Sequence, residues 1–301
     1  MEETKVKRPF WKSPYMLVIP AFLFYLLFWA YPVFTALKEV FTSVDGGFTF
    51  ENFAMMFQDE KFGEAFLNTI VFAGVSIVLQ FFLALALALL INRNFKGSSF
   101  FLFIMMIPMA IPIAAVGIIW DTGLTEFGWV NSLLNQTGLQ WLLESVNIMD
   151  GNILWKGVTG MQAVGFLILI DTWTVLPSVM IIILAGLQNL NKEYSEAALV
   201  FGATRFQSIK DIVIPIIKPT IITSLLLRII SGVQVWLISV MVFDFDTVPF
   251  LVERIVYYTK FYYTEEYFKL SVAYSLLVML LVMSIAFLFL RANKKAEEGV
   301  N

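Results

Sequence analysis

Long runs of uncharged, mostly apolar residues alternate along this chain with short polar stretches. Four runs contain no Asp, Glu, Lys or Arg, namely residues 13–37, 65–92, 97–120 and 270–290. Two more, residues 157–191 and 219–243, are interrupted only by Asp171 and by Arg228 respectively. Each run is long enough to cross a bilayer, which takes about 20 residues of α-helix. The pattern therefore predicts six membrane spans.

These runs are predicted to be helices rather than barrel strands. They lack the alternation of polar and apolar positions that marks such strands, and a helix satisfies its own backbone hydrogen bonds in lipid. We predict an all-α, polytopic membrane protein with a membrane domain over residues 14–292, a preceding segment 1–13 and a tail 293–301. The spans are placed at about residues 14–37, 66–92, 98–120, 160–184, 219–243 and 270–290.

The basic residues indicate how the chain is oriented. Six spans put both termini on one side, and 13 of the 20 Lys and Arg residues fall on that side, against six on the other and Arg228 within a span. Loops rich in Lys and Arg stay in the cytoplasm. Both termini are thus predicted to be cytoplasmic, in a multi-pass protein of the cytoplasmic (inner) membrane.

Composition excludes several chemistries. Hydrophobic residues make up 59% of the chain and charged residues 14%, whereas soluble proteins carry about 25% charged residues. The absence of His and Cys removes imidazole and thiolate metal ligands and a histidine general base, so no metal site is expected. The chain also lacks a Gly-x-x-x-x-Gly-Lys-Ser/Thr phosphate-binding loop. We therefore do not expect an enzyme.

The loop between the fourth and fifth spans, residues 188–218, is long for a simple connection. We predict a short helix over residues 193–201, ended by Gly202 because glycine readily adopts positive φ there, and a second helical stretch running into Pro215. Ala197, Val200 and Phe201 share one face of the first helix. On this pattern alone, the helix either lies on the membrane surface or docks onto a partner.

The same loop carries a spaced motif. Glu196-Ala197-Ala198 is followed by Gly202 and, after nine further residues, by Ile212-Val213-Ile214-Pro215. This pattern resembles the signature loop of importer permeases of the ATP-binding-cassette (ABC) superfamily. Ile214 replaces the usual Leu, and Phe201 stands where many of these permeases have Asp.

Other segments are similar to the carbohydrate-uptake branch of that superfamily, the maltose- and glycerol-3-phosphate-type permeases. The resemblance covers about residues 10–292. The segments are Asn68-Thr69, residues 92–97, Ile107-Pro108 with Ile111-Pro112, Asp171-Thr172-Trp173 and residues 185–188.

The resemblance implies the fold of a type I ABC importer permease, in which a coupling helix inserts into a groove of a cytoplasmic ATPase. It also implies a second homologous permease, two copies of the ATPase carrying ATP and Mg²⁺, and an extracytoplasmic solute-binding protein. No cofactor is expected in this chain, and its other partners are membrane lipid and a small sugar, not nucleic acid. The residues expected at the ATPase contact are Glu196, Ala197, Ala198, Phe201, Gly202, Ile212 and Pro215.

Two charges are predicted to lie near the middle of the membrane, where isolated charges are costly. At about 1.5 Å per residue, Asp171 and Arg228 reach comparable depths in the fourth and fifth spans. One hypothesis is a buried ion pair joining two helices; another is a polar cavity that binds a polyhydroxylated solute, and a third is contact with a partner permease. The candidate cavity residues are Asp171, Trp173, Thr174, Ser178, Arg228, Ser231 and Gln234.

These observations favour the permease subunit of an ATP-driven, binding-protein-dependent importer of a sugar, preferably a neutral mono- or oligosaccharide. A polyol or a sugar phosphate such as glycerol-3-phosphate is the alternative solute. From another class, an ion-coupled secondary transporter would use Asp171 but would not explain residues 188–218. Pro108 and Pro112 are expected to curve the third span or to form a hinge. The loop over residues 121–156 either covers the cavity or meets the binding protein.

Overall fold

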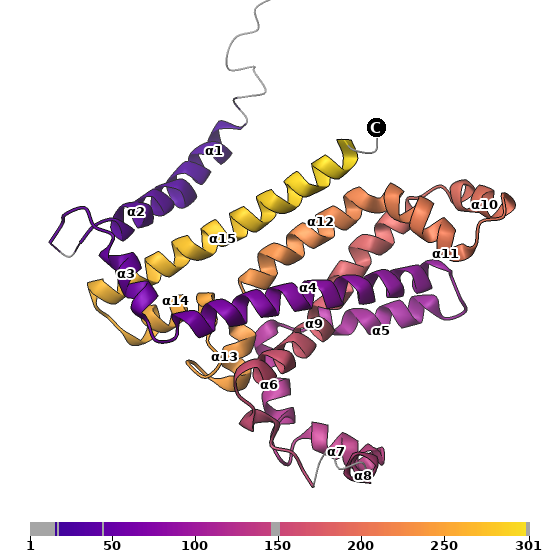
Figure 1. Cartoon of the computed structure of the whole chain (residues 1–301), viewed down its shortest axis with the longest axis horizontal. Helices are drawn as coiled ribbons and strands as arrows, with labels where there is room; N and C mark the ends of the chain where they lie inside the picture. Colours follow the sequence, from indigo (N-terminus) through magenta and orange to yellow (C-terminus); the bar gives the residue numbers. More distant parts are fainter. Residues whose placement is uncertain (1–15, 17, 44, 146–150, 299–301) are drawn as a thin grey trace, which may run out of the picture.

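The computed structural model describes residues 16, 18–43, 45–145 and 151–298, which form a bundle of long helices with short helices near their ends (Figure 1). The predicted all-α fold is confirmed, since the described residues contain no strand beyond an isolated bridge between Thr42 and Phe48. Within the described chain, five helices are long and apolar enough to span a membrane: Ile19–Val40, Phe62–Asn92, Gly160–Gln188, Arg205–Val233 and Glu265–Lys294. The predicted segment 1–13 lies outside the described residues.

The spans are built from labelled elements that differ from the predicted bounds by a few residues at most ends. The last span also differs, because α15 continues as a helix to Glu298 and includes most of the predicted tail. The spanning elements are α1 (Ile19–Tyr25), η3 (Leu26–Ala30) and α2 (Tyr31–Val40), then α4 (Phe62–Asn92), α9 (Gly160–Gln188), α11 (Arg205–Ser208), η5 (Ile209–Val213), α12 (Ile214–Val233) and α15 (Glu265–Glu298). The shorter elements are α3 (Glu51–Gln58), α7 (Trp129–Gln136), α8 (Leu139–Ser145), η4 (Trp155–Gly157), α10 (Lys192–Val200) and α14 (Leu251–Phe261).

The third predicted span is not one helix. It is divided into α5 (Ser98–Ala110) and α6 (Ile113–Gly123), which meet at an angle of 93°. A residue before proline is driven out of the helical region, and Ile111 accordingly has φ −84° and ψ 127° before Pro112. Pro108 lies inside α5 without ending it. The expected kink is therefore a full break at Pro112, and α5 alone is too short to cross a bilayer.

The fifth predicted span, residues 219–243, also differs. Its helix begins earlier, at Arg205, and ends at Val233; after a short non-helical connection, α13 (Leu237–Phe243) packs against α6. The close approach is possible because Gly117 has no side chain: a Cβ atom there would lie 2.2 Å from the Cβ of Met241. The packing of α6 and α13 thus turns the chain away from a straight span, a feature that a continuous apolar run does not reveal.

Helix α9 lies at the centre of the bundle, whereas Ile19–Val40 is almost entirely exposed (Figure 1). The main partner of α9 is α4, whose small residues Ala84 and Ala88 pack in one cluster with Met180 and Ile183 of α9. Small side chains let two helices approach closely in lipid, where van der Waals packing and hydrogen bonds drive association. The α4–α9 pair is therefore the framework on which the polar groups of the membrane interior are held.

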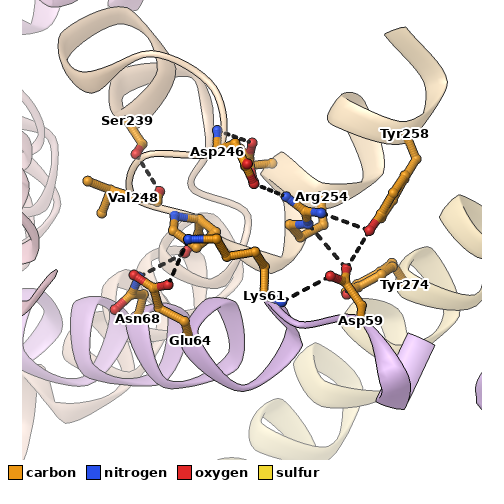
Figure 2. Close-up of polar contacts among 12 residues, drawn as sticks. Asp59, Lys61, Glu64, Asn68, Ser239, Asp246, Val248, Arg254, Tyr258 and Tyr274 are labelled. Carbon is orange, nitrogen blue, oxygen red and sulfur yellow. Dashed lines mark hydrogen bonds and ion pairs between the residues drawn. The ribbon is translucent and has the colours of Figure 1, made fainter. Parts of the chain in front are cut away.

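A cluster of charged and phenolic groups joins α14 and α15 to the chain just before α4, at the end of the bundle farthest from α10 (Figure 2). Asp59 accepts hydrogen bonds from Tyr258 at 2.6 Å and Tyr274 at 2.5 Å, and pairs with Arg254 at 3.3 Å. Burial raises the pKa of Asp59, but the bonds from the two tyrosines and the charge of Arg254 outweigh this effect and lower it overall. Arg254 also pairs with Asp246 at 2.6 Å. The Asp59 carboxylate is therefore held ionised.

Candidate functional site

The loop with the spaced motif forms a capped helix. The side chain of Asn191 accepts the backbone N–H of Glu193 at the start of α10, which satisfies one of the free donors of its first turn. Gly202 has φ +87°, and the next backbone N–H, that of Ala203, returns to the carbonyl of Ala198 at 3.0 Å. The predicted glycine stop is confirmed, with the left-handed residue and returning hydrogen bond that end many helices.

A second helix follows at once and continues into the membrane. Thr204 and Gln207 form a capping box at the start of α11. The chain then passes through the π-helical turn η5 into α12, so residues 205–233 are helical throughout. Pro215 has no N–H for the carbonyl four residues before it, and the π-turn ends at Val213, two residues before this position. Ile212 is half-buried on this path and Pro215 is exposed.

Helix α10 projects from the bundle (Figure 1), and large apolar side chains are exposed at its C-terminal end. Val200 is 85% exposed and Phe201 91% exposed, and Phe206 on α11 is also largely exposed. Glu196 and Ala197 are exposed as well, while Ala198 is buried against the rest of the protein. The motif thus has one residue that anchors the helix and a free surface of one carboxylate, one small residue and large apolar side chains.

In the interior of the bundle, Asp171 and Arg228 form an ion pair in which the guanidinium Nη2 donates to the carboxylate Oδ2. Both side chains are buried, at 8% and 3% exposed, so the predicted contact between them is confirmed. Arg228 also donates to Ser76 of α4 at 3.1 Å and to Ser231 at 2.9 Å. The charge of each residue is therefore neutralised within the protein rather than exposed to lipid.

Gln80 of α4 also contacts this ion pair, although it is not among the cavity residues predicted from the sequence. Its Nε2 donates to Asp171 Oδ2 at 2.7 Å and lies 3.4 Å from the hydroxyl of Thr172, and the side chain is completely buried. Gln80 Oε1 and Arg228 Nε have no hydrogen-bond partner within the described chain. The signal for Gln80 is a polar amide in the middle of an apolar run, which a search restricted to charged residues overlooks.

Among the other predicted cavity residues in the described chain, Ser231 alone bonds to the ion pair. Thr174 is buried and Ser178 half-buried, and their hydroxyls donate to backbone carbonyls of their own helix, at 2.9 Å and 2.7 Å. Trp173 is 38% exposed and its ring meets that of Trp120 edge-on at 6.0 Å. Ser231 is exposed, but Gln234 lies beyond the end of α12. Gln234 therefore does not continue the helix that carries Arg228 and Ser231.

The described residues contain no group of three His, Cys, Asp or Glu side chains placed to hold a metal ion.

The comparison with known families bears on the loop and the bundle together. Residues 80–296, which include α9, the motif loop and α12, match the family described as the binding-protein-dependent transport system inner membrane component. The chain belongs to this family. It is a membrane permease subunit, as its apolar helices and its resemblance to ABC importers predicted.

Curated relatives of this permease carry transport names. It is 28% identical to the trehalose/maltose transport system permease protein MalF of Thermococcus litoralis, over 75% of each chain. It is 30% identical to the sulfoquinovosyl glycerol transport system permease protein SmoG of Agrobacterium fabrum, over 73% of this chain and 70% of that one. A sn-glycerol-3-phosphate permease, UgpA of the same organism, is 26% identical over 69% of each chain.

A solved structure shows the same fold. A chain of a bacterial ABC transporter involved in the import of the acidic polysaccharide alginate superposes with a TM-score of 0.78 at 23% identity, over 93% of this permease and 94% of that chain. A second structure, of a bacterial alginate ABC transporter in complex with an alginate pentasaccharide-bound periplasmic protein, gives a TM-score of 0.75, also at 23% identity, over 91% of each chain. The predicted fold of an ABC importer permease is thus confirmed.

Proposed function

We propose that this permease forms the membrane pathway of an ATP-driven importer for a sugar, a neutral mono- or oligosaccharide in the first place. The ion pair between Asp171 and Arg228 carries this proposal, because it leaves the described interior of the bundle without a free guanidinium to attract an anionic solute. The names of the relatives include a trehalose/maltose permease, which supports a sugar. A polyol or a sugar phosphate is the second candidate, favoured by the glycerol-3-phosphate relative.

The solute would contact the groups near the pair that remain accessible. Trp173 offers an aromatic face and Ser231 a hydroxyl, on α9 and α12 respectively. Flat aromatic rings and neutral hydrogen-bonding groups suit a polyhydroxylated solute. Asp171 and Arg228 would position these helices, and Thr174, Ser178 and Gln234 complete the proposed set.

The exposed surface of α10 is proposed to dock into a groove of a separate ATPase. Glu196 offers a carboxylate to a basic partner, small Ala197 permits close approach, and Phe201 adds an apolar contact where many relatives have Asp. Ala198, Gly202, Ile212 and Pro215 fix the shape of the loop. Two copies of the ATPase would bind ATP and Mg²⁺, so this chain itself needs no cofactor.

The remaining partners and the orientation follow from the same proposal. A second homologous permease would complete the pathway, and an extracytoplasmic binding protein would deliver the solute. Both termini and α10 would lie in the cytoplasm. Because residues 205–233 form one continuous helix, a movement imposed on the loop by the ATPase would reach Arg228 through a stiff element. Such a helix would link ATP hydrolysis mechanically to the membrane interior.

Reconstitution tests this function against ion-coupled transport. The permease would be co-expressed with a candidate ATPase, second permease and binding protein, and placed in proteoliposomes with ATP inside. We expect uptake of labelled trehalose or maltose that requires internal ATP and the binding protein and is unaffected by ionophores. Uptake that persists without ATP and collapses with an ionophore would contradict the proposal; selective uptake of glycerol-3-phosphate would support the second solute class.

A further inference from the structure

A cavity of about 520 Å³ lies between the motif loop and the ends of two spanning helices. Its walls come from the last turn of α4 and the turn that follows, from the end of α9, and from the surface of α10, α11 and η5 that faces the bundle. The lining includes Leu89, Leu187, Leu199, Ile209 and Val213 on the apolar side. This cavity is separate from Asp171 and Arg228, and nothing in the transport proposal uses it.

The polar part of the cavity carries one sign of charge. Arg93, after α4, and Arg205, at the start of α11, both line it, together with the amides and hydroxyl of Asn92, Asn94 and Ser208. Within the described part of the chain, no Asp or Glu lines this cavity and neither arginine forms an ion pair. Two guanidinium groups that line one cavity without a carboxylate suit the oxygens of a phosphate ester.

We propose that this cavity binds the phosphate of an anionic phospholipid between Arg93 and Arg205. The apolar walls favour an amphiphile over a free ion, because Leu89 and Leu187 belong to the final turns of spanning helices, where the glycerol and upper acyl groups of a lipid lie. Basic pockets between spanning helices on the cytoplasmic side commonly bind anionic headgroups. The choice of leaflet rests on the orientation given under the proposed function; a free phosphate ester is the other source of the same chemistry.

A bound lipid would contact both the loop and the helix ends. Leu199 of α10 and Val213 of η5 line the same cavity as Leu187 of α9, so one ligand bridges the motif loop to the core of the bundle. Filling this space restricts how far the loop moves relative to α9. The lipid therefore acts as a brace for the segment that is proposed to meet the ATPase.

Lipid binding to the purified full-length permease tests the site without the ATPase or a solute, so a failure of the transport proposal leaves this test intact. The permease in detergent would be titrated with phosphatidylglycerol or phosphatidylcholine, and bound lipid counted by native mass spectrometry. The variant is Arg93→Gln/Arg205→Gln. The matched control is Lys96→Gln/Lys210→Gln, which removes the same charge from exposed neighbours that do not line the cavity. Arg93→Lys/Arg205→Lys retains the charge if the first variant folds poorly.

We expect phosphatidylglycerol to bind the wild type and the lysine control, and to bind the Arg93→Gln/Arg205→Gln variant at least about tenfold more weakly. The Arg93→Lys/Arg205→Lys variant should retain part of the affinity. Equal losses in the variant and the control, or no loss in either, would overturn the site. Displacement of the lipid by millimolar glucose 6-phosphate or inorganic phosphate would overturn the lipid as the occupant and assign the cavity to a soluble phosphate.

Discussion

Arg228 of α12 donates a hydrogen bond to Asp171 of α9, and the same carboxylate oxygen accepts the amide of Gln80 from α4. Three spanning helices therefore meet at one oxygen atom in the membrane interior. Hydrogen bonds of this kind hold helices together where the lipid gives no hydrophobic driving force between them. The ion pair is thus first a structural joint, and its effect on the solute is to keep the positive charge of Arg228 occupied.

Removing one member of this pair should destabilise the permease more than removing both. Asp171→Asn and Arg228→Gln each leave an uncompensated buried group, at a cost of about 3–5 kcal/mol. The double variant leaves two neutral amides and should lose less than the sum of the single effects. Thermal unfolding in detergent, followed by intrinsic tryptophan fluorescence, measures all four proteins. Strictly additive shifts in Tm would show that the two residues do not interact.

The contact of α6 with α13 should depend on Gly117. A methyl group there overlaps the side chain of Met241, so Gly117→Ala should destabilise the fold by about 1–3 kcal/mol. Gly165→Ala on α9 is the control, because its added Cβ meets nothing within 4 Å and should be neutral or slightly stabilising. Comparing the Tm values of the two variants checks the packing. A Gly117→Ala protein as stable as Gly165→Ala would exclude the close approach.

Distorting the C-terminal end of α10 should uncouple ATP hydrolysis from solute uptake. Gly202 has open space around it but a positive φ, so Gly202→Asp strains the backbone by about 1–2 kcal/mol while leaving membrane insertion intact. Glu196→Lys reverses the charge of the exposed surface. In reconstituted transporter, both variants should release or uncouple ATPase activity and reduce uptake, while Gly63→Ala in α4 should not. Normal uptake in both loop variants would contradict the proposed role of α10.

The cluster around Asp59 should make stability depend on acid. The folded protein lowers the pKa of Asp59 below its ordinary value of about 3.9, so the unfolded chain binds this proton more readily. Its stabilising contribution is present above pH 4 and is lost as the pH falls through the folded pKa. We expect the Tm of the wild type to fall more steeply below pH 4 than that of Asp59→Asn. Asp45→Asn, at an exposed position, should follow the wild type; parallel curves for all three proteins would refute the prediction.

Substitutions at the proposed solute contacts should change sugar uptake but not basal ATPase activity. Trp173→Ala and Gln234→Ala should alter sugar uptake without lowering basal ATPase activity, because neither residue lies in the motif loop. Leu227→Ala, which changes an exposed apolar residue of α12, is the control and should leave uptake unchanged. Uptake assays with several labelled sugars measure the effect. If both variants transport every sugar normally, the solute contacts lie elsewhere, for example on the partner permease.

Several features could be predicted from the sequence because each follows from a local requirement. A helix in lipid needs about 20 uncharged residues, and this places most spans within a few residues. Gly202 takes the positive φ that ends α10, as its position after a helical pattern indicates. Asp171 and Arg228 stand out because charges in apolar runs need partners. Whether α10 docks onto an ATPase stays a prediction.

Other features depend on contacts between distant segments, which local patterns do not encode. Residues 97–120 and 219–243 read as spanning runs, the second interrupted only by Arg228, yet both are broken, because Pro112 ends one helix and α13 turns to pack on Gly117 of α6. Gln80 carries no charge, and it contacts the ion pair only because α4 packs along α9. The sequence by itself determined which segments enter the membrane, because transfer to lipid depends on each residue's own polarity. Only the tertiary structure decided where they bend and which polar groups meet, because packing depends on the shapes of two surfaces at once.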